Sequence, residues 1–305
     1  MNTETGMAKP RTLNSQSDYF SKTRKRLEAR GQTPEMPITT IPSLDKMIWG
    51  IKRRELTVVA GRTSMGKSAF MNQLAWDIAG SKMNVLYLSL EMDVPSLQER
   101  LFCNVCDVEN FALIKGAYSA VPEIQKKWLD FEGMVEDRRM EYCDYIGRTW
   151  KEIDDMLMGL HKKPDVIFID HINEIMSATA KDRRSVIDDY ILHLRAMSVR
   201  DNFALVLGAQ INRMGQTETN KEPQLHQIKE SGAVEQVCDL ALLLWWPWKD
   251  NGNNPENIFK VNVAKNRNGW TGHLKINYEP KFYRFSDLPA GLIPDKKTKQ
   301  NALDD

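Results

Sequence analysis

The stretch Leu56-Thr-Val-Val-Ala-Gly61-Arg-Thr-Ser-Met-Gly66-Lys67-Ser68 decides the fold of this chain. Residues 56–60 form a short apolar run, which is typical of a strand buried on both faces of a parallel sheet. Residues 61–68 match the phosphate-loop pattern G-x-x-x-x-G-K-S/T, and an amphipathic helical pattern follows through Ala79. Because the motif lies between a strand and a helix, the sequence predicts a nucleotide-binding site.

The residue types of this loop each have a chemical task. Glycines let the backbone curl so that its N–H groups point at phosphate oxygens, and the following helix adds its dipole. A lysine supplies a cation for the β- and γ-phosphates, and a serine hydroxyl can bind Mg²⁺. We therefore expect ATP or another nucleoside triphosphate, with Mg²⁺, to be held by Gly61, Ser64, Met65, Gly66, Lys67, Ser68 and Ala69.

Strands and helices alternate along the rest of the chain. This alternation predicts an α/β fold with a mostly parallel central sheet, helices on both faces and an antiparallel C-terminal edge. Helices are expected at 151–161 and 183–200. Further strands are expected at 85–90, 140–145, 166–169, 204–209, 240–245, 259–264, 274–278 and 282–285.

Three polar residues directly follow expected strands. The carboxyl ends of parallel strands meet at one edge of the sheet, so these residues should converge on the phosphate loop. Asp170 has the position of the Walker B acid, which binds Mg²⁺. Glu91 is the candidate base that orients the hydrolytic water, and Gln210 is suited to sense the γ-phosphate. The simpler alternatives are a helix-capping acid for Glu91 and a solvated strand end for Gln210.

The charge balance gives no reason of its own to expect a nucleic-acid partner. The 305 residues include 42 Lys and Arg against 41 Asp and Glu, which leaves a formal charge of +1. A strongly basic chain would have pointed to nucleic acid, and this one does not.

Two other classes of protein are disfavoured by the sequence. The longest apolar run, 240–248, is far shorter than the roughly 20 residues of a membrane-spanning helix, and the N-terminus has no signal-peptide pattern. We therefore expect no membrane partner and a cytoplasmic protein. The four cysteines are too few for a disulfide framework, and Cys103 and Cys106 lack the second pair that a metal site would need. Buried thiols are the expectation.

Six strings of residues together resemble the C-terminal motor domain of DnaB-type replicative helicases, which have a RecA-like fold. They come in the order of that family, and the resemblance covers roughly residues 38–285. The strings are GRTSMGKS at 61–68, SLEM at 89–92, IFID at 167–170, AQINR at 209–213, KESGAVEQ at 229–236 and AKNRNG at 264–269.

The resemblance implies a hexameric ring that hydrolyses ATP at subunit interfaces and moves 5′ to 3′ on single-stranded DNA during replication. Glu91, Asp170 and Gln210 would have the roles given above, and Arg100 matches a family arginine near the nucleotide. Lys265 and Arg267 match basic fingers offered to the neighbouring subunit's γ-phosphate. Without the resemblance, these two residues would be interpreted as solvated charges.

DNA contact would fall to two loops that face the channel of the ring, at 171–184 and 213–232. Arg213, Lys229, Glu230 and Gly232 match positions that hold the phosphate backbone, which gives a grip that is independent of sequence. Encirclement supplies much of the hold in a ring, so a charge of +1 does not argue against DNA.

The resemblance also sets the expected organisation and partners. Residues 1–36 form a tail and a basic arm with a helix at 19–30, residues 37–288 the motor domain, and residues 289–305 a disordered tail. The arm is either a solvated helix or the contact through which a homohexamer forms. Only about 35 residues precede the core, so we expect the family's separate N-terminal domain, and its usual primase surface, to be absent. The resemblance further implies a primase and a helicase loader as partners. It implies a location in the cytoplasm of a bacterial or phage-infected cell.

Two features and two other functions stay open. His171 directly follows the Walker B acid, where phage primase-helicases often have histidine, and the tryptophans at 245–248 suit a core or subunit-interface position better than base stacking. The alternative functions are another RecA-type ATPase (a recombinase or a KaiC-like regulator) and a non-motor, ATP-switched loading factor.

Overall fold

The computed structural model describes residues 16–28, 31, 34–174, 183–211, 222–228, 232–252 and 254–289. The chain divides into two compact units, Met1–Pro34 and Glu35–Asp305. The described part of the first unit contains the helix α1 (Gln16–Glu28), so the predicted helix at 19–30 is present but begins three residues earlier. Its side chains Phe20 and Leu27 are exposed, and Arg24 lies 3.7 Å from Glu28 across one turn.

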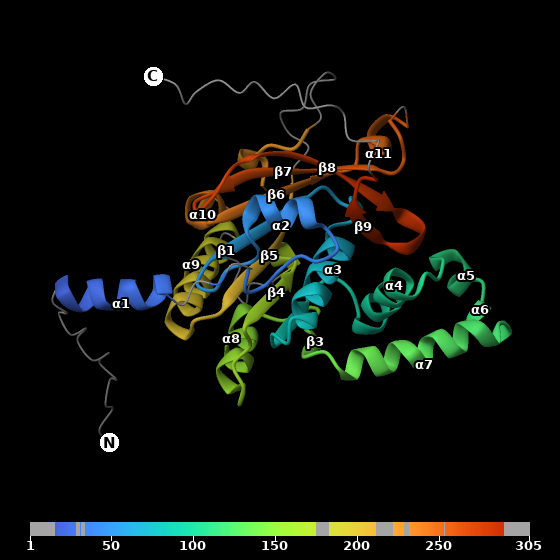
Figure 1. The fold of residues 1–305 in the computed structure, drawn as a ribbon, viewed down its shortest axis with the longest axis horizontal. Coiled ribbons are helices and arrows are strands. Elements are labelled where there is room, and N and C mark those ends of the chain that lie inside the picture. The colour runs from blue at the N-terminus through green and yellow to red at the C-terminus, as the bar shows by residue number, and fades with distance from the viewer. Residues whose placement is uncertain are drawn as a thin grey trace. The chain divides into compact units, whose positions relative to one another are not determined.

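The second unit is built on a nine-stranded sheet with the order β3-β2-β4-β5-β1-β6-β7-β8-β9 (Figure 1). Strands β1 to β6 pair in parallel with one another, and β7, β8 and β9 add antiparallel pairs beyond β6, as the sequence predicted. The strands are β1 (Leu56–Gly61), β2 (Val85–Ser89), β3 (Met140–Asp144), β4 (Val166–Asp170), β5 (Ala204–Gln210), β6 (Leu240–Trp245), β7 (Ile258–Asn266), β8 (Gly272–Glu279) and β9 (Arg284–Asp287).

Helices cover both faces of this sheet. The α-helices of the second unit are α2 (Pro42–Ile48), α3 (Lys67–Gly80), α4 (Val94–Cys106), α5 (Asn110–Ile114), α6 (Ala117–Ala120), α7 (Pro122–Glu136), α8 (Trp150–Gly159), α9 (Arg183–Asp201), α10 (Gly232–Val237) and α11 (Pro247–Asn251). Three short 3-10 helices, η1 (Ile172–Glu174), η2 (Leu225–Gln227) and η3 (Pro280–Phe282), also lie in the described residues.

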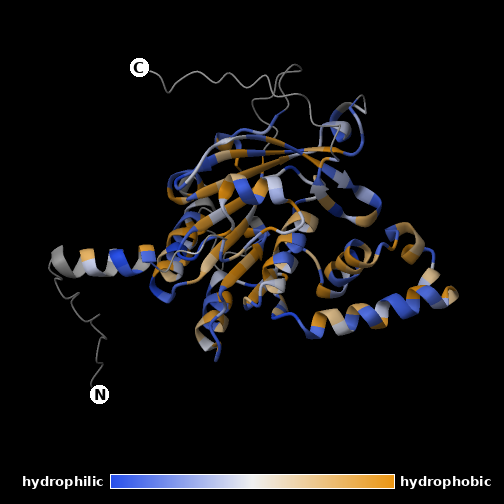
Figure 2. Cartoon of the chain, in the orientation of Figure 1, coloured by the Kyte–Doolittle hydropathy of each residue, from blue (hydrophilic) through white to orange (hydrophobic). Residues whose placement is uncertain are grey.

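The two faces explain why the central strands are apolar throughout. Side chains alternate between the faces of a strand, and in β1 Val58 packs in the core under α9 whereas Val59 packs in the core under α3. All six residues of β1 are buried, and Figure 2 shows hydrophobic residues gathered on the strands. A strand covered on both sides has no solvent face, so an alternating polar pattern is not needed.

One predicted strand is wrong in its position. The sequence predicted a strand at 282–285, but Pro280 begins η3, Tyr283 has a left-handed backbone (φ 54°), and β9 starts only at Arg284. Proline fixes its own φ and favours the first turn of a helix, which the apolar pattern alone does not reveal.

The expectation of buried thiols holds for two of the four cysteines. Cys103 and Cys238 are buried, Cys106 and Cys143 are partly buried, and all four thiols are free. Burial raises the pKa of the Cys103 thiol to about 12. In the described part of the chain, no helix is both long and apolar enough to cross a membrane.

Candidate functional site

The predicted phosphate loop joins the carboxyl end of β1 to the first residue of α3. Gly61 ends the strand and Lys67 begins the helix. Two residues of the loop have left-handed backbones, Ser64 (φ 60°) and Gly66 (φ 79°). At Gly66 a β-carbon would also lie 3.2 Å from the Phe285 ring, so glycine suits both the conformation and the packing. This curled loop has the shape that directs N–H groups toward an anion.

Strand register brings the predicted acidic and amide residues to the same edge. Gln210 lies beside Gly61 in the β1–β5 pair, and Asp170 lies beside Ser89 in the β2–β4 pair. The N–H of Leu90 donates to the carbonyl of Asp170, 2.8 Å away, and Glu91 follows directly. The convergence expected for a parallel sheet is therefore present.

Lys67 and Asp170 form a buried ion pair at the centre of this edge. Lys67 Nζ lies 2.8 Å from Asp170 Oδ1, and both side chains are buried. Tyr87 donates to Asp170 Oδ2 at 3.0 Å, and the Ser68 hydroxyl also bonds the carboxylate. Burial alone would raise the pKa of Asp170, but the charge and hydrogen bonds of Lys67 and Ser68 outweigh it and lower the pKa. The carboxylate is thus ionised beside a serine hydroxyl, the donor set that Mg²⁺ prefers.

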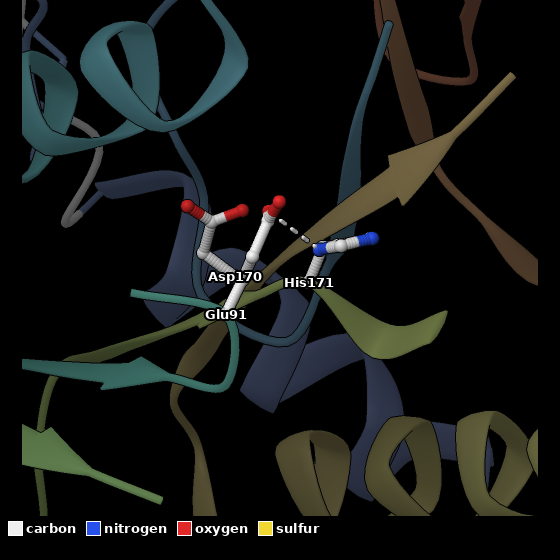
Figure 3. Close-up of side chains that lie close together, drawn as sticks. All are labelled: Glu91, Asp170 and His171. Carbon is white, nitrogen blue, oxygen red and sulfur yellow. Dashed lines mark ion pairs between the residues drawn. The ribbon is translucent and has the colours of Figure 1, made fainter. Parts of the chain in front are cut away.

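Glu91 lies beside this pair and contacts a buried histidine (Figure 3). Its Oε2 lies 3.1 Å from His171 Nδ1 and 4.0 Å from Lys67 Nζ. The close contact with His171 is the largest cause that lowers the pKa of Glu91, and the charge of Lys67 acts in the same direction. Ligand atoms of Glu91, Asp170 and His171 lie within 4.8 Å of one another. An ionised carboxylate is therefore available to accept a proton from water.

Lys67, Glu91 and His171 line a cavity of about 430 Å³, a size that suits a small-molecule ligand. Arg100 lines it from α4, with its guanidinium over the ring of Tyr283 at 5.1 Å. Gln210 donates to the Thr63 hydroxyl at 2.6 Å. The residues of this cavity, here called the loop cavity, are Gly61, Arg62, Thr63, Ser64, Gly66, Lys67, Ser68, Glu91, Met92, Arg100, His171, Glu174 and Gln210.

Two of the predicted nucleotide-binding residues do not line the loop cavity. The side chains of Met65 and Ala69 belong to the apolar core under the sheet. Any contact that they make with a nucleotide would therefore come from their backbone.

The tryptophan-rich segment after β6 braces the phosphate loop, which the sequence did not reveal. Asp250 Oδ1 lies 2.9 Å from an Arg62 guanidinium nitrogen, and its Oδ2 accepts a hydrogen bond from the Trp245 indole at 2.6 Å. Lys249 Nζ donates to the Ser64 carbonyl at 2.7 Å. Trp246 is buried and stacks on the partly buried Trp248, so the core position holds for Trp246, and a subunit-interface position for the group stays a prediction. No local pattern could have shown this brace, because Arg62 and Asp250 are 188 residues apart.

Lys265 and Arg267 lie at the opposite edge of the sheet. Asn266 pairs with Leu240, which pairs with Thr57 near the start of β1, whereas the phosphate loop follows the end of β1. A strand rises about 3.3 Å per residue, so the six residues of β1 separate the two edges by about 17 Å. The two cations therefore do not reach the phosphate loop of their own chain.

Both cations bind groups of their own chain at that edge. Lys265 Nζ donates to the carbonyls of Glu235 and Gln236, at the end of α10. Arg267 donates to the Gln236 carbonyl at 2.8 Å and lies 3.3 Å from Asp239. The alternative of two purely solvated charges is thus too simple.

Of the four predicted DNA-binding residues, one lies in the described part of the chain. Arg213, Lys229 and Glu230 lie outside the described residues, and Gly232 is the first residue of α10. The loop predicted at 171–184 is described through Glu174 and again from Arg183.

The sheet, the curled loop after β1 and the buried Lys67–Asp170 pair define an α/β P-loop fold of the RecA-like kind. Within this class, residues 38–287 match the sequence profile of the family described as "DnaB-like helicase C terminal domain". The match covers most of the chain, and the chain belongs to this family.

Solved structures and curated relatives give the same picture. One similar structure, described as a DnaB-like replicative helicase and its interactions with primase, has a TM-score of 0.80 and 22% identity over 90% of this chain and 68% of that one. Another, described as an ATPase domain, has a TM-score of 0.81 and 23% identity over 91% of this chain and 100% of that one. At these identities the likeness is one of fold.

The relatives are longer proteins. A probable plasmid replicative DNA helicase of Chlamydia trachomatis serovar L2 is 27% identical over 78% of this chain and 52% of its own length. The replicative DNA helicase DnaB of Rickettsia felis is 24% identical over 82% of this chain and 57% of its own length. The chain thus spans about half the length of the curated relatives that it matches.

Proposed function

We propose that this chain is the ATP-driven motor of a ring-shaped replicative DNA helicase, moving 5′ to 3′ on single-stranded DNA. One observation carries the proposal: Lys67, Glu91 and Gln210 line the loop cavity, and the buried Asp170 pairs with Lys67 Nζ at 2.8 Å. A full hydrolytic set is more than a nucleotide switch needs. Family membership favours a helicase over a recombinase or a KaiC-like regulator.

The residues have the following proposed tasks. Ser68 and Asp170 hold Mg²⁺, and Lys67 binds the β- and γ-phosphates. Glu91, which is ionised because the contacts with His171 and Lys67 lower its pKa, orients the attacking water and accepts its proton. Gln210 contacts the γ-phosphate, and its bond to Thr63 links it to the phosphate loop.

The completed site needs a second subunit. Lys265 and Arg267 are about one strand length from their own chain's loop, so we propose that they act on the neighbour's nucleotide in a homohexamer. The basic arm at 1–36 is the proposed subunit contact, and an unchanged hexamer in a chain lacking it, measured by light scattering, would exclude that role. The same proposal includes single-stranded DNA in the channel of the ring, contacted through Arg213, Lys229, Glu230 and Gly232. It also includes a primase and a helicase loader as partners, and a cytoplasmic location.

The proposal is tested by ATP turnover with and without single-stranded DNA. We expect DNA to stimulate turnover, and Glu91→Gln to lower kcat by at least about 100-fold while nucleotide affinity stays within about threefold, because only proton transfer is removed. The matched control is Glu109→Gln, an exposed acid that pairs with Lys281 and does not line the loop cavity. Unwinding of a forked DNA should require ATP and a 5′ tail. Turnover that is indifferent to DNA would contradict the motor function.

A further inference from the structure

His171 is a buried histidine whose two ring nitrogens both face carboxylates. It is 4% exposed, in contrast to its neighbours Glu91 and Glu174, which are about half exposed. Nδ1 lies 3.1 Å from Glu91 Oε2, and Nε2 lies 3.4 Å from Glu174 Oε1. None of the tasks proposed above uses this residue.

The position of the ring is fixed by its surroundings. His171 directly follows the last residue of β4, and Ile172 anchors the next turn because its side chain is 1% exposed. On the neighbouring strand β5, a β-carbon at Gly208 would lie 3.0 Å from the His171 β-carbon and 2.9 Å from Asp170 Oδ1. Only a glycine there lets the histidine backbone approach so closely. The ring is thus held by the core of the protein.

Glu91, in contrast, has little else to hold it. It lies beyond the end of β2 and its side chain is 46% exposed. Lys67 Nζ, 4.0 Å away, attracts the same oxygen toward the phosphate loop. Among the described residues, no acceptor is aligned for a hydrogen bond with His171 Nδ1, so this buried nitrogen is an unsatisfied donor that lies 3.1 Å from Glu91 Oε2. A flexible base beside a fixed donor is the situation in which one hydrogen bond decides the orientation.

We propose that His171 is a positioning residue, whose Nδ1–H holds Glu91 Oε2 in place and leaves Oε1 to orient the attacking water. This inference rests on the proposed function, because it requires Glu91 to be the base. The cluster of Glu91, Asp170 and His171 would also fit a cation, but Mg²⁺ prefers oxygen ligands and both ring nitrogens already face carboxylates. A ligand role for His171 is therefore an outcome that the test must separate.

The test uses two amide variants of the full chain. In His171→Asn the amide nitrogen takes the position of Nδ1, and in His171→Gln it takes the position of Nε2. We expect His171→Gln to lower kcat by at least about tenfold with KM for ATP unchanged within about twofold, because the orientation of the base matters in the transition state. His171→Asn should keep kcat within about threefold of wild type, since it keeps the donor toward Glu91.

A double variant separates positioning from a general structural role. In a Glu91→Gln background, His171→Gln should cause no further loss of kcat, because the group that it positions is gone. Equal losses in the two amide variants, or an additive loss in the double variant, would overturn the inference. A raised Mg²⁺ requirement in both amide variants would overturn it in favour of a ligand role.

The inference and the proposed function fail in different ways. A wild-type chain without ATP turnover, or a fully active Glu91→Gln chain, overturns the proposed function. A folded His171→Gln chain with wild-type kcat overturns only the inference. Should His171→Gln fail to fold, a folded His171→Asn chain with a loss of tenfold or more also overturns it.

Discussion

The two edges of the parallel sheet both gather charged side chains, but they use them differently. At the carboxyl edge, Lys67 and Glu91 line the loop cavity, Asp170 pairs with Lys67, and the Glu91 side chain is half exposed. At the amino edge, Asp239 is buried and binds the Leu56 N–H, Arg195 at 2.9 Å and Arg267 at 3.3 Å. The first network is open to a ligand, whereas the second ties strands and helices of one chain together.

This difference indicates how a single chain can have a stable fold and still lack part of its catalytic site, which we propose a neighbouring subunit supplies. The amino edge stabilises the chain, and it also holds the cations that we propose to act on a neighbour. Substitutions at this edge should therefore have their largest effect on the rate of ATP hydrolysis. Their effect on the free energy of unfolding should be smaller, and their effect on the pH dependence of that free energy should be the smallest.

The largest effect should follow removal of a finger at the amino edge. Arg267→Ala should lower DNA-stimulated turnover by about 1,000-fold, because an arginine finger stabilises transition-state charge. A mixture of Arg267→Ala and Lys67→Ala chains should recover at least about tenfold over either alone, since a ring can then pair an intact loop with an intact finger. The measurement is steady-state ATP hydrolysis.

The control for this mixture is the double variant Lys67→Ala with Arg267→Ala, combined with Lys67→Ala. This combination contains no intact phosphate loop, so its turnover should stay at background. Full activity of Arg267→Ala alone would mean that the two edges do not cooperate between subunits.

A smaller effect is expected on stability at the amino edge. Asp239→Asn should lower the free energy of unfolding by about 3 kcal/mol, because it removes the charge that Arg195 and Arg267 face. Denaturation in urea measures this change. Lys281→Ala, which breaks an exposed pair with Glu109, should cost less than about 1 kcal/mol. Equal costs would mean that the amino edge is not the more stabilising network.

The smallest expected effect is on the pH dependence of the free energy of unfolding, and it concerns an ion pair at the same edge. Arg53 lies 2.7 Å from Asp165, which also accepts a hydrogen bond from the Asn84 N–H. Burial opposes ionisation of Asp165, but these bonds outweigh it and lower its pKa. The stabilisation is therefore full above the unfolded-state pKa, about 3.9, and is lost as pH falls through the lower folded-state pKa.

The variant Asp165→Asn tests this sign. We expect wild type to exceed it by about 1 kcal/mol in free energy of unfolding from about pH 5 to 8, and the difference to shrink below about pH 4. Urea titrations at each pH give the comparison. A difference that grows as the pH falls would contradict the lowered pKa.

Much of the carboxyl edge could be predicted from local patterns. The phosphate loop is one continuous motif between a strand and a helix, and Asp170, Glu91 and Gln210 each directly follow an apolar run. A parallel sheet brings all such positions to one edge, so the fold class was enough to bring them together. The prediction of a strand at 282–285 was wrong because Pro280 begins a short 3-10 helix that extends to Phe282.

Contacts between distant segments could not be predicted in this way. The Asp250 carboxylate that holds Arg62, and the Asp239 carboxylate that joins β1, α9 and Arg267, each depend on how loops meet after the sheet has formed. Glu174, near His171, had no motif of its own. The DNA-binding roles of Arg213, Lys229 and Glu230 remain predictions, since these residues lie outside the described part of the chain.

The sequence by itself determined that this chain has a phosphate loop in an α/β fold and that it resembles a helicase motor. The reason is that the spacing of hydrophobic residues and a continuous motif are both local properties of the chain. Only the tertiary structure decided which charges face the loop cavity, which are held by their own chain, and that His171 and Glu91 meet. The physical reason is that ion pairs and hydrogen bonds depend on distance in space, which the order of residues along a chain does not specify.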